Sequence, residues 1–99
     1  MDVARSVNGV SVRLTEERWL HIVENHDEVA GYYDDVLAVV EDPEVVLRGY
    51  RGSQIAVRSY GPKRYLMVVY REVSPEDGFI ITAYFASQFD RKKTLWRRQ

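Results

Sequence analysis

Residues 41–50 read EDPEVVLRGY, and the spacing of hydrophobic residues changes within this stretch. Before it, hydrophobic residues recur every three or four positions, which is typical of helices. After it, they form short runs rich in Val, Ile, Tyr and Phe, which is typical of strands. Pro43 marks the boundary, because a residue that precedes proline avoids helical backbone angles. The pattern predicts helices before Pro43 and strands after it.

Two helices are predicted in the first part of the chain. The first runs from about Glu16 to His26, with Thr15 as its N-cap and acidic residues in its first turn, where the helix dipole favours them. The second runs from near Gly31 to just before Asp42, because its hydrophobic residues again follow helical spacing. A short extended segment within residues 7–14 is expected to precede both helices.

Four strand-like segments follow Pro43, at residues 44–50, 53–60, 64–73 and 78–87. Short connections that contain Gly, Pro, Ser or Asp separate them, so consecutive segments are expected to pair antiparallel. The sequence therefore predicts a single α+β domain over residues 1–99, with two N-terminal helices packed on a four-stranded antiparallel β-sheet meander.

Side chains alternate between the two faces of a strand, so the sheet should separate polar from apolar residues. The polar face is predicted to hold Arg58, Tyr60, Thr82 and Tyr84. The opposite face, under the helices, is predicted to hold Ile55, Val57, Ile81 and Phe85. Arginine, tyrosine and a hydroxyl together suit a phosphate and a stacked base. The competing interpretation is an ordinary solvent-facing strand surface, on which these residue types are common.

Composition excludes several classes of protein. The chain has no cysteine, which rules out disulfides and thiolate metal sites and is compatible with a cytoplasmic location. No hydrophobic run approaches the roughly 18 residues of a membrane span, and residues 1–10 do not fit a secretory signal. The net charge is −1, but residues 88–99 carry five basic residues against Asp90. This basic C-terminal end has a net charge of +4, which leaves −5 for residues 1–87.

Both histidines lie in the first predicted helix, in the stretch WLHIVENHDEV of residues 19–29. His26 belongs to the apolar face, whereas His21 lies roughly opposite, beside Arg18 and Asn25. The i, i+5 spacing differs from the i, i+4 spacing of helical zinc sites, so no metal site is expected. A histidine on an apolar face is commonly structural, and its other use is acid–base catalysis. The spacing does not choose between these two uses.

The ordered set LTEERWLHIVENHDE, VLAVVEDPEVV, IAVRSY, LMVVYREV and FIITAYFA, closed by KKTLW, resembles a family of small nuclease domains. These are the phage- and toxin-associated domains of the barnase–EndoU–colicin E5/D–RelE class. The resemblance covers residues 12–96 and implies metal-independent cleavage of RNA, by a cytoplasmic toxin that a cognate antitoxin holds inactive. Asp27 stands where the family often has proline.

The resemblance implies a role for several residues and requires no cofactor. The implied catalytic residues are His26, Arg58, Thr82, Tyr84 and His21. The implied substrate-binding residues are Tyr60, Arg91, Lys92 and Lys93. In this mechanism a base removes the proton of a ribose 2′-OH, and Arg58 stabilises the charge that develops on the phosphate. The alternative function is a non-catalytic protein-interaction module on the same fold, which would bind its partner through an exposed sheet edge.

Overall fold

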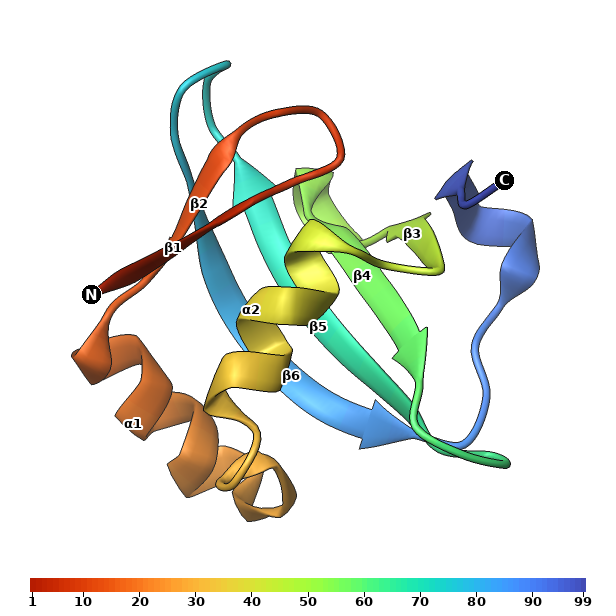
Figure 1. Ribbon diagram of the computed structural model, residues 1–99, viewed down its shortest axis with the longest axis horizontal. Coiled ribbons are helices and arrows are strands. Elements are labelled where there is room, and N and C mark those ends of the chain that lie inside the picture. Colours follow the sequence, from red (N-terminus) through yellow and green to blue (C-terminus); the bar gives the residue numbers. More distant parts are fainter.

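A mixed sheet of seven strands runs through the structure, a computed structural model that describes all residues from 1 to 99 (Figure 1). Its strands lie in the order β1-β2-β6-β5-β4-β3-β7. Their bounds are Asp2–Arg5 (β1), Ser11–Leu14 (β2), Val45–Arg48 (β3), Gln54–Ser59 (β4), Tyr65–Glu72 (β5), Gly78–Ala86 (β6) and Thr94–Arg97 (β7). Every neighbouring pair is antiparallel except β2 and β6, which pair in parallel through Val12–Gly78 and Arg13–Phe79.

The predicted four-stranded antiparallel meander with two N-terminal helices is therefore wrong, although the fold is α+β and has two α-helices. The four predicted segments do form β3 to β6, and they pair consecutively. The β1–β2 hairpin precedes the helices, and β7 follows the meander and pairs with β3. These three strands have only four residues each, and all four residues of β7 are exposed. The extended segment expected within residues 7–14 contains β2, whereas β1 and β7 carry too little alternation to be recognised from their own residues.

The helices lie close to their predicted positions, between β2 and β3. Helix α1 spans Glu16–Asn25, and the Thr15 hydroxyl accepts a hydrogen bond from the Arg18 backbone N–H at 3.1 Å, as expected of an N-cap. Helix α2 spans Tyr33–Glu41 and ends at Asp42, just before Pro43. A short 3-10 helix, η1 (Asp27–Val29), joins the two. Helix α2 crosses one face of the sheet, whereas α1 lies beside β6 (Figure 1).

Both faces of the sheet bury hydrophobic side chains. The larger cluster lies between the sheet and the helices and includes Leu14, Ile22, Leu66, Tyr70 and Ile80. A smaller cluster lies on the other face and consists of Val45, Leu47, Val57 and Met67. The segment that follows β6 contributes Phe89 to this second cluster, so it covers part of the face that the helices leave open. Burial on both faces explains why the central strands are hydrophobic throughout.

The strand register places the predicted polar residues on opposite faces, so the face prediction is wrong. Arg58 pairs with Leu66, which pairs with Phe85, and these residues share the helix-covered face. Val57 pairs with Met67, which pairs with Tyr84, and these share the helix-free face. Thr82 lies on the helix-free face with Tyr84 because it is two residues away.

A β-bulge at Ile81 contributes to this error. Val69 pairs with Thr82 and Tyr70 pairs with Ile80, so Ile81 is an extra residue in β6. The bulge shifts the alternation within β6, so that Ile80 is buried under the helices while Thr82 faces the other side.

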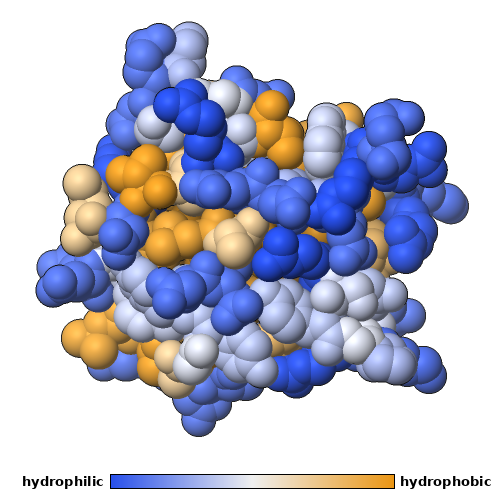
Figure 2. Space-filling model, viewed as in Figure 1, coloured by the Kyte–Doolittle hydropathy of each residue, from blue (hydrophilic) through white to orange (hydrophobic).

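The surface on the helix side is mostly hydrophilic, with hydrophobic residues in several separate patches (Figure 2). Neither helix is long and apolar enough to cross a membrane.

Candidate active site at the edge of β6

The outer edge of β6 has a strand partner over only part of its length. Strand β2 pairs with Gly78 and Phe79 alone, and from Ile81 onward α1 and η1 lie against this edge instead. The Arg18 guanidinium donates to the Ile81 carbonyl, and the Glu28 carboxylate accepts from the Phe85 N–H, both at 3.5 Å. These long contacts place one side chain of α1 and one of η1 directly beside the backbone of β6.

A polar cleft of about 300 Å³ lies between α1 and this edge. The residues that line it are Arg18, His21, Ile22, Asn25, His26, Ile81 and Thr82. It contains both histidines of the chain and has no acidic residue in its lining. A second depression of about 240 Å³ continues along α1 and shares Arg18 and His21 with it. The cleft therefore offers two imidazoles, a guanidinium and a hydroxyl to one small ligand group.

His26 reaches the cleft because the helix ends before it. Its backbone φ of −139° and ψ of 72° are not helical, although its N–H still donates to the Ile22 carbonyl at 2.7 Å. The imidazole ring lies against the Tyr84 ring, with centroids 5.6 Å apart and an angle of 36° between the planes. Its Nδ1 is 3.8 Å from Glu28 Oε2, and the side chain is 37% exposed. The ring is thus oriented by its neighbours and open to a ligand.

His21 lines the same cleft from within the helix. It is exposed, and its backbone carbonyl accepts a hydrogen bond from the Asn25 side chain at 2.8 Å. Helical spacing predicts that His21 and His26 point in different directions, but the chain leaves the helix at His26 and both residues line this cleft. Arg18 and Asn25 are cleft residues that were not predicted, although both were expected beside His21 on the helix.

Tyr84 lies beside the cleft, at the helix-free face of the sheet. Burial raises the pKa of Tyr84 above its ordinary value, so its hydroxyl stays protonated and can donate a hydrogen bond at neutral pH. That hydroxyl has no hydrogen-bond partner within the protein. Three of the five predicted catalytic residues, His21, His26 and Thr82, therefore line the cleft, and a fourth, Tyr84, lies against His26 without lining it.

Arg58, the fifth, is on the helix-covered side and contacts α2 instead. Its guanidinium donates to the Asp42 carbonyl at 3.2 Å and lies 3.4 Å from the Tyr60 hydroxyl. The Tyr60 hydroxyl donates to Asp35 at 2.7 Å, and burial is the largest of the effects that raise its pKa. Arg58 and Tyr60 therefore tie β4 to α2. The predicted convergence of Arg58 with Thr82 and Tyr84 on one phosphate is wrong.

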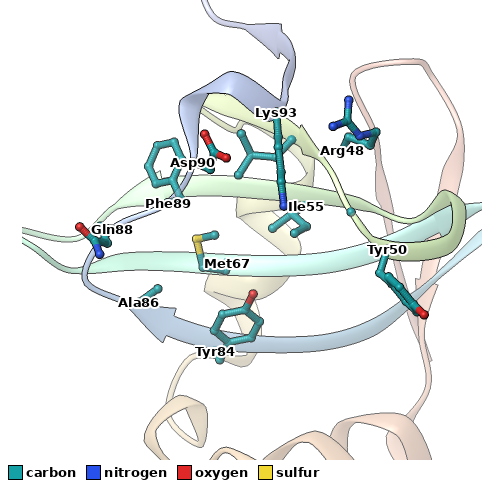
Figure 3. Close-up of a pocket in the computed structure, with 12 residues that line it drawn as sticks. Arg48, Tyr50, Ile55, Met67, Tyr84, Ala86, Gln88, Phe89, Asp90 and Lys93 are labelled. Carbon is teal, nitrogen blue, oxygen red and sulfur yellow. The ribbon is translucent and has the colours of Figure 1, made fainter.

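The basic residues of the C-terminal segment lie outside the cleft. Arg91, Lys92 and Lys93 form the short 3-10 helix η3 and are exposed. The Asp90 carboxylate accepts from the Lys92 N–H at 2.9 Å and caps this turn. Arg91 lies over the Phe89 ring at 4.6 Å, and Lys93 points toward the helix-free face (Figure 3).

No family model, curated protein or solved structure matches the chain. No group of three or more His, Asp or Glu side chains is placed to hold a metal ion. The resemblance to small nuclease domains therefore stays a prediction, and the geometry of the cleft carries the functional argument.

Proposed function

We propose that this protein is a metal-independent endoribonuclease whose catalytic residues line the cleft between α1 and β6. The observation that carries the proposal is the presence of His21, His26 and Arg18 in one cleft without an acidic residue in its lining. Cleavage of RNA through its 2′-OH needs a base, an acid and a positive charge near the phosphate, and these three side chains can supply them.

The reaction would proceed in one transfer step. One histidine takes the proton from the ribose 2′-OH, and the 2′ oxygen forms a bond to the adjacent phosphorus. The bond from phosphorus to the 5′ oxygen breaks, and the other histidine gives its proton to that oxygen. The products are a 2′,3′-cyclic phosphate and a free 5′-OH. Arg18 takes the charge-stabilising role that the resemblance assigned to Arg58, and Thr82 can donate a hydrogen bond to a phosphate oxygen.

The proposal includes a cytoplasmic toxin that a cognate antitoxin protein inhibits. The support is the charge distribution, because the exposed basic residues of η3 and β7 could bind the RNA backbone or an acidic inhibitor. Arg91 and Lys92 remain the proposed contacts to phosphates that flank the cleaved bond, whereas Lys93, also predicted to bind substrate, points toward the helix-free face.

The test is cleavage of an unstructured RNA by the purified protein and by single variants. His26→Ala and His21→Ala should each lower the rate by about 10²- to 10⁴-fold, as loss of an acid or base does. Arg18→Ala should lower it by about 10²- to 10³-fold. EDTA should have no effect, and the rate should fall as salt rises. The matched control is Arg58→Ala, whose rate per folded molecule should stay close to wild type. Full activity in the His26 variant, or loss of activity in EDTA, would refute the proposal.

The exposed edge of β7 favours a second candidate function, which is a non-catalytic interaction module. Strand β7 is the last strand of the sheet, and Leu95 and Trp96 are exposed on it at 56% and 36%. A free strand edge with exposed hydrophobic residues can pair with a strand of a partner protein. A folded chain that cuts no RNA and binds a protein through β7 would favour this function.

A further inference from the structure

A cavity of about 510 Å³ opens on the helix-free face of the sheet, separate from the cleft of the histidines (Figure 3). Its hydrophobic floor consists of Leu47, Ile55, Met67, Ala86 and Phe89. Leu47 and Met67 belong to the smaller core cluster, so strands β3 and β5 hold this floor rigidly. The segment from Gln88 to Lys93 forms one wall, because it returns over the sheet to reach β7.

The rim of the cavity provides both hydrogen-bond donors and acceptors. Lys93 extends into the space from η3, and the Tyr84 hydroxyl is directed toward it from β6 (Figure 3). Gln88 and Asp90 line the same wall, and Asp90 uses only its Oδ1 to cap η3. Arg48 lies at the rim with its guanidinium directed outward (Figure 3).

Tyr84 joins this cavity to the proposed catalytic cleft. One part of its ring lies against His26, and the same side chain lines the cavity. The cavity and the cleft are therefore neighbours on the two sides of one aromatic side chain.

We infer that the cavity binds the base of an unpaired nucleotide next to the phosphate that is cleaved, an inference that rests on the proposed ribonuclease function. A flat ring with a polar edge matches a hydrophobic floor that has donors and acceptors at its rim. An alkyl chain would make no hydrogen bond to Asp90, Gln88 or Tyr84, whereas the polar edge of a base can. A base within a duplex is stacked between its neighbours and cannot enter, so single-stranded RNA is the substrate class. Arg48 is placed to contact the phosphate outside the rim.

The binding test uses a short single-stranded 2′-O-methyl RNA, which cannot be cleaved because its 2′ oxygen carries no proton. Its affinity for the wild-type protein is compared with that of an oligomer of equal length whose central nucleotides lack bases. Removal of the bases should weaken binding by between about fivefold and a hundredfold, which is the range for loss of one stacked base. A duplex of the same sequence should bind no better than the oligomer without bases.

Two variants locate the effect. The Ala86→Trp side chain fills the cavity from the half-exposed end of β6. This variant should bind the oligomer with bases more weakly than wild type does, and no better than it binds the oligomer without bases. Lys93→Ala changes an exposed residue and leaves the core intact, and it should weaken binding of the oligomer with bases more than binding of the other. A thermal melt confirms that each variant is folded.

The outcomes separate the two proposals. If wild-type protein binds both oligomers equally, or if Ala86→Trp keeps the wild-type preference, the base site is refuted even when RNA is cleaved. If the preference for bases is present and depends on Ala86 while no RNA is cleaved, the base site stands and the ribonuclease proposal fails. In an active enzyme, Ala86→Trp should raise KM for RNA more than it lowers kcat.

Discussion

Replacing Tyr70 by phenylalanine should stabilise this protein, although most substitutions of a buried residue destabilise. Tyr70 is 0% exposed within the core under the helices, and its hydroxyl has no hydrogen-bond partner. Burial raises the pKa of Tyr70, and the nearby Glu72 carboxylate raises it further. In the unfolded chain the same hydroxyl is bonded to water. Folding therefore loses a hydrogen bond at this position and gains none.

The magnitude follows from that loss. A buried polar group without a partner costs about 1–3 kcal/mol. Removing the oxygen also removes its dispersion contacts, each worth about 0.1–0.2 kcal/mol, and leaves a small void. The net gain in the free energy of unfolding for Tyr70→Phe should be about 1 kcal/mol. In a domain of this size it would raise Tm by about 4–8 °C.

The matched control is Tyr60→Phe, directly after the neighbouring strand β4, at a tyrosine that packs against the same core cluster. The Tyr60 hydroxyl donates to Asp35 at 2.7 Å and lies close to Arg58, so its removal should lower stability by about 1 kcal/mol. Urea unfolding of both variants and of wild type, followed by circular dichroism, measures the two changes. A loss of 1 kcal/mol or more in Tyr70→Phe would contradict the reasoning, because it would mean that the hydroxyl has a partner such as a buried water.

Three further predictions concern other parts of the fold. Thr15→Ala removes the side-chain cap of α1 and should lower the free energy of unfolding by about 1 kcal/mol in urea titrations, while Thr15→Asn should restore it. Gly78→Ala would place a Cβ 2.5 Å from the Arg71 carbonyl oxygen, so the same titration should show a free energy of unfolding that is lower by about 1–3 kcal/mol. An unchanged urea midpoint would contradict this close approach. The hydrogen bond from Tyr33 to Asp2 raises the pKa of Tyr33 to about 12, so the folded state holds this proton more tightly than the unfolded state. Its stabilisation should be complete below about pH 10 and lost toward pH 12, and Tyr33→Phe should show a smaller loss of stability over this range than wild type.

Local features of the sequence determined the helices and the order of the central strands. Thr15 begins α1 because its hydroxyl bonds an N–H three residues away, and Pro43 stops α2 through its effect on the preceding residue. Short polar connections between hydrophobic runs also made β3 to β6 pair with their neighbours along the chain. Each of these interactions joins residues close in the chain, so their pattern is visible without the fold.

The structure places both histidines in one cleft but leaves Arg58 outside it, and the reason lies in the strand register. The alternation of side chains shows which residues share a face within one strand. It does not show which of the two faces packs against the helices. That choice was made by the strand register, in which Arg58 pairs with Leu66 and Leu66 pairs with Phe85. Arg58 consequently contacts α2, and Arg18 occupies the cleft.

The parallel contact of β2 with β6 and the pairing of β7 with β3 were likewise decided only by tertiary structure. Both join segments that are distant in the chain and too short to form alone. The same contacts leave the edge of β6 open beside α1 and bring the C-terminal segment over the helix-free face. The sequence thus determined which residues carry useful chemistry, whereas burial of hydrophobic surface between distant segments decided which of them share a site.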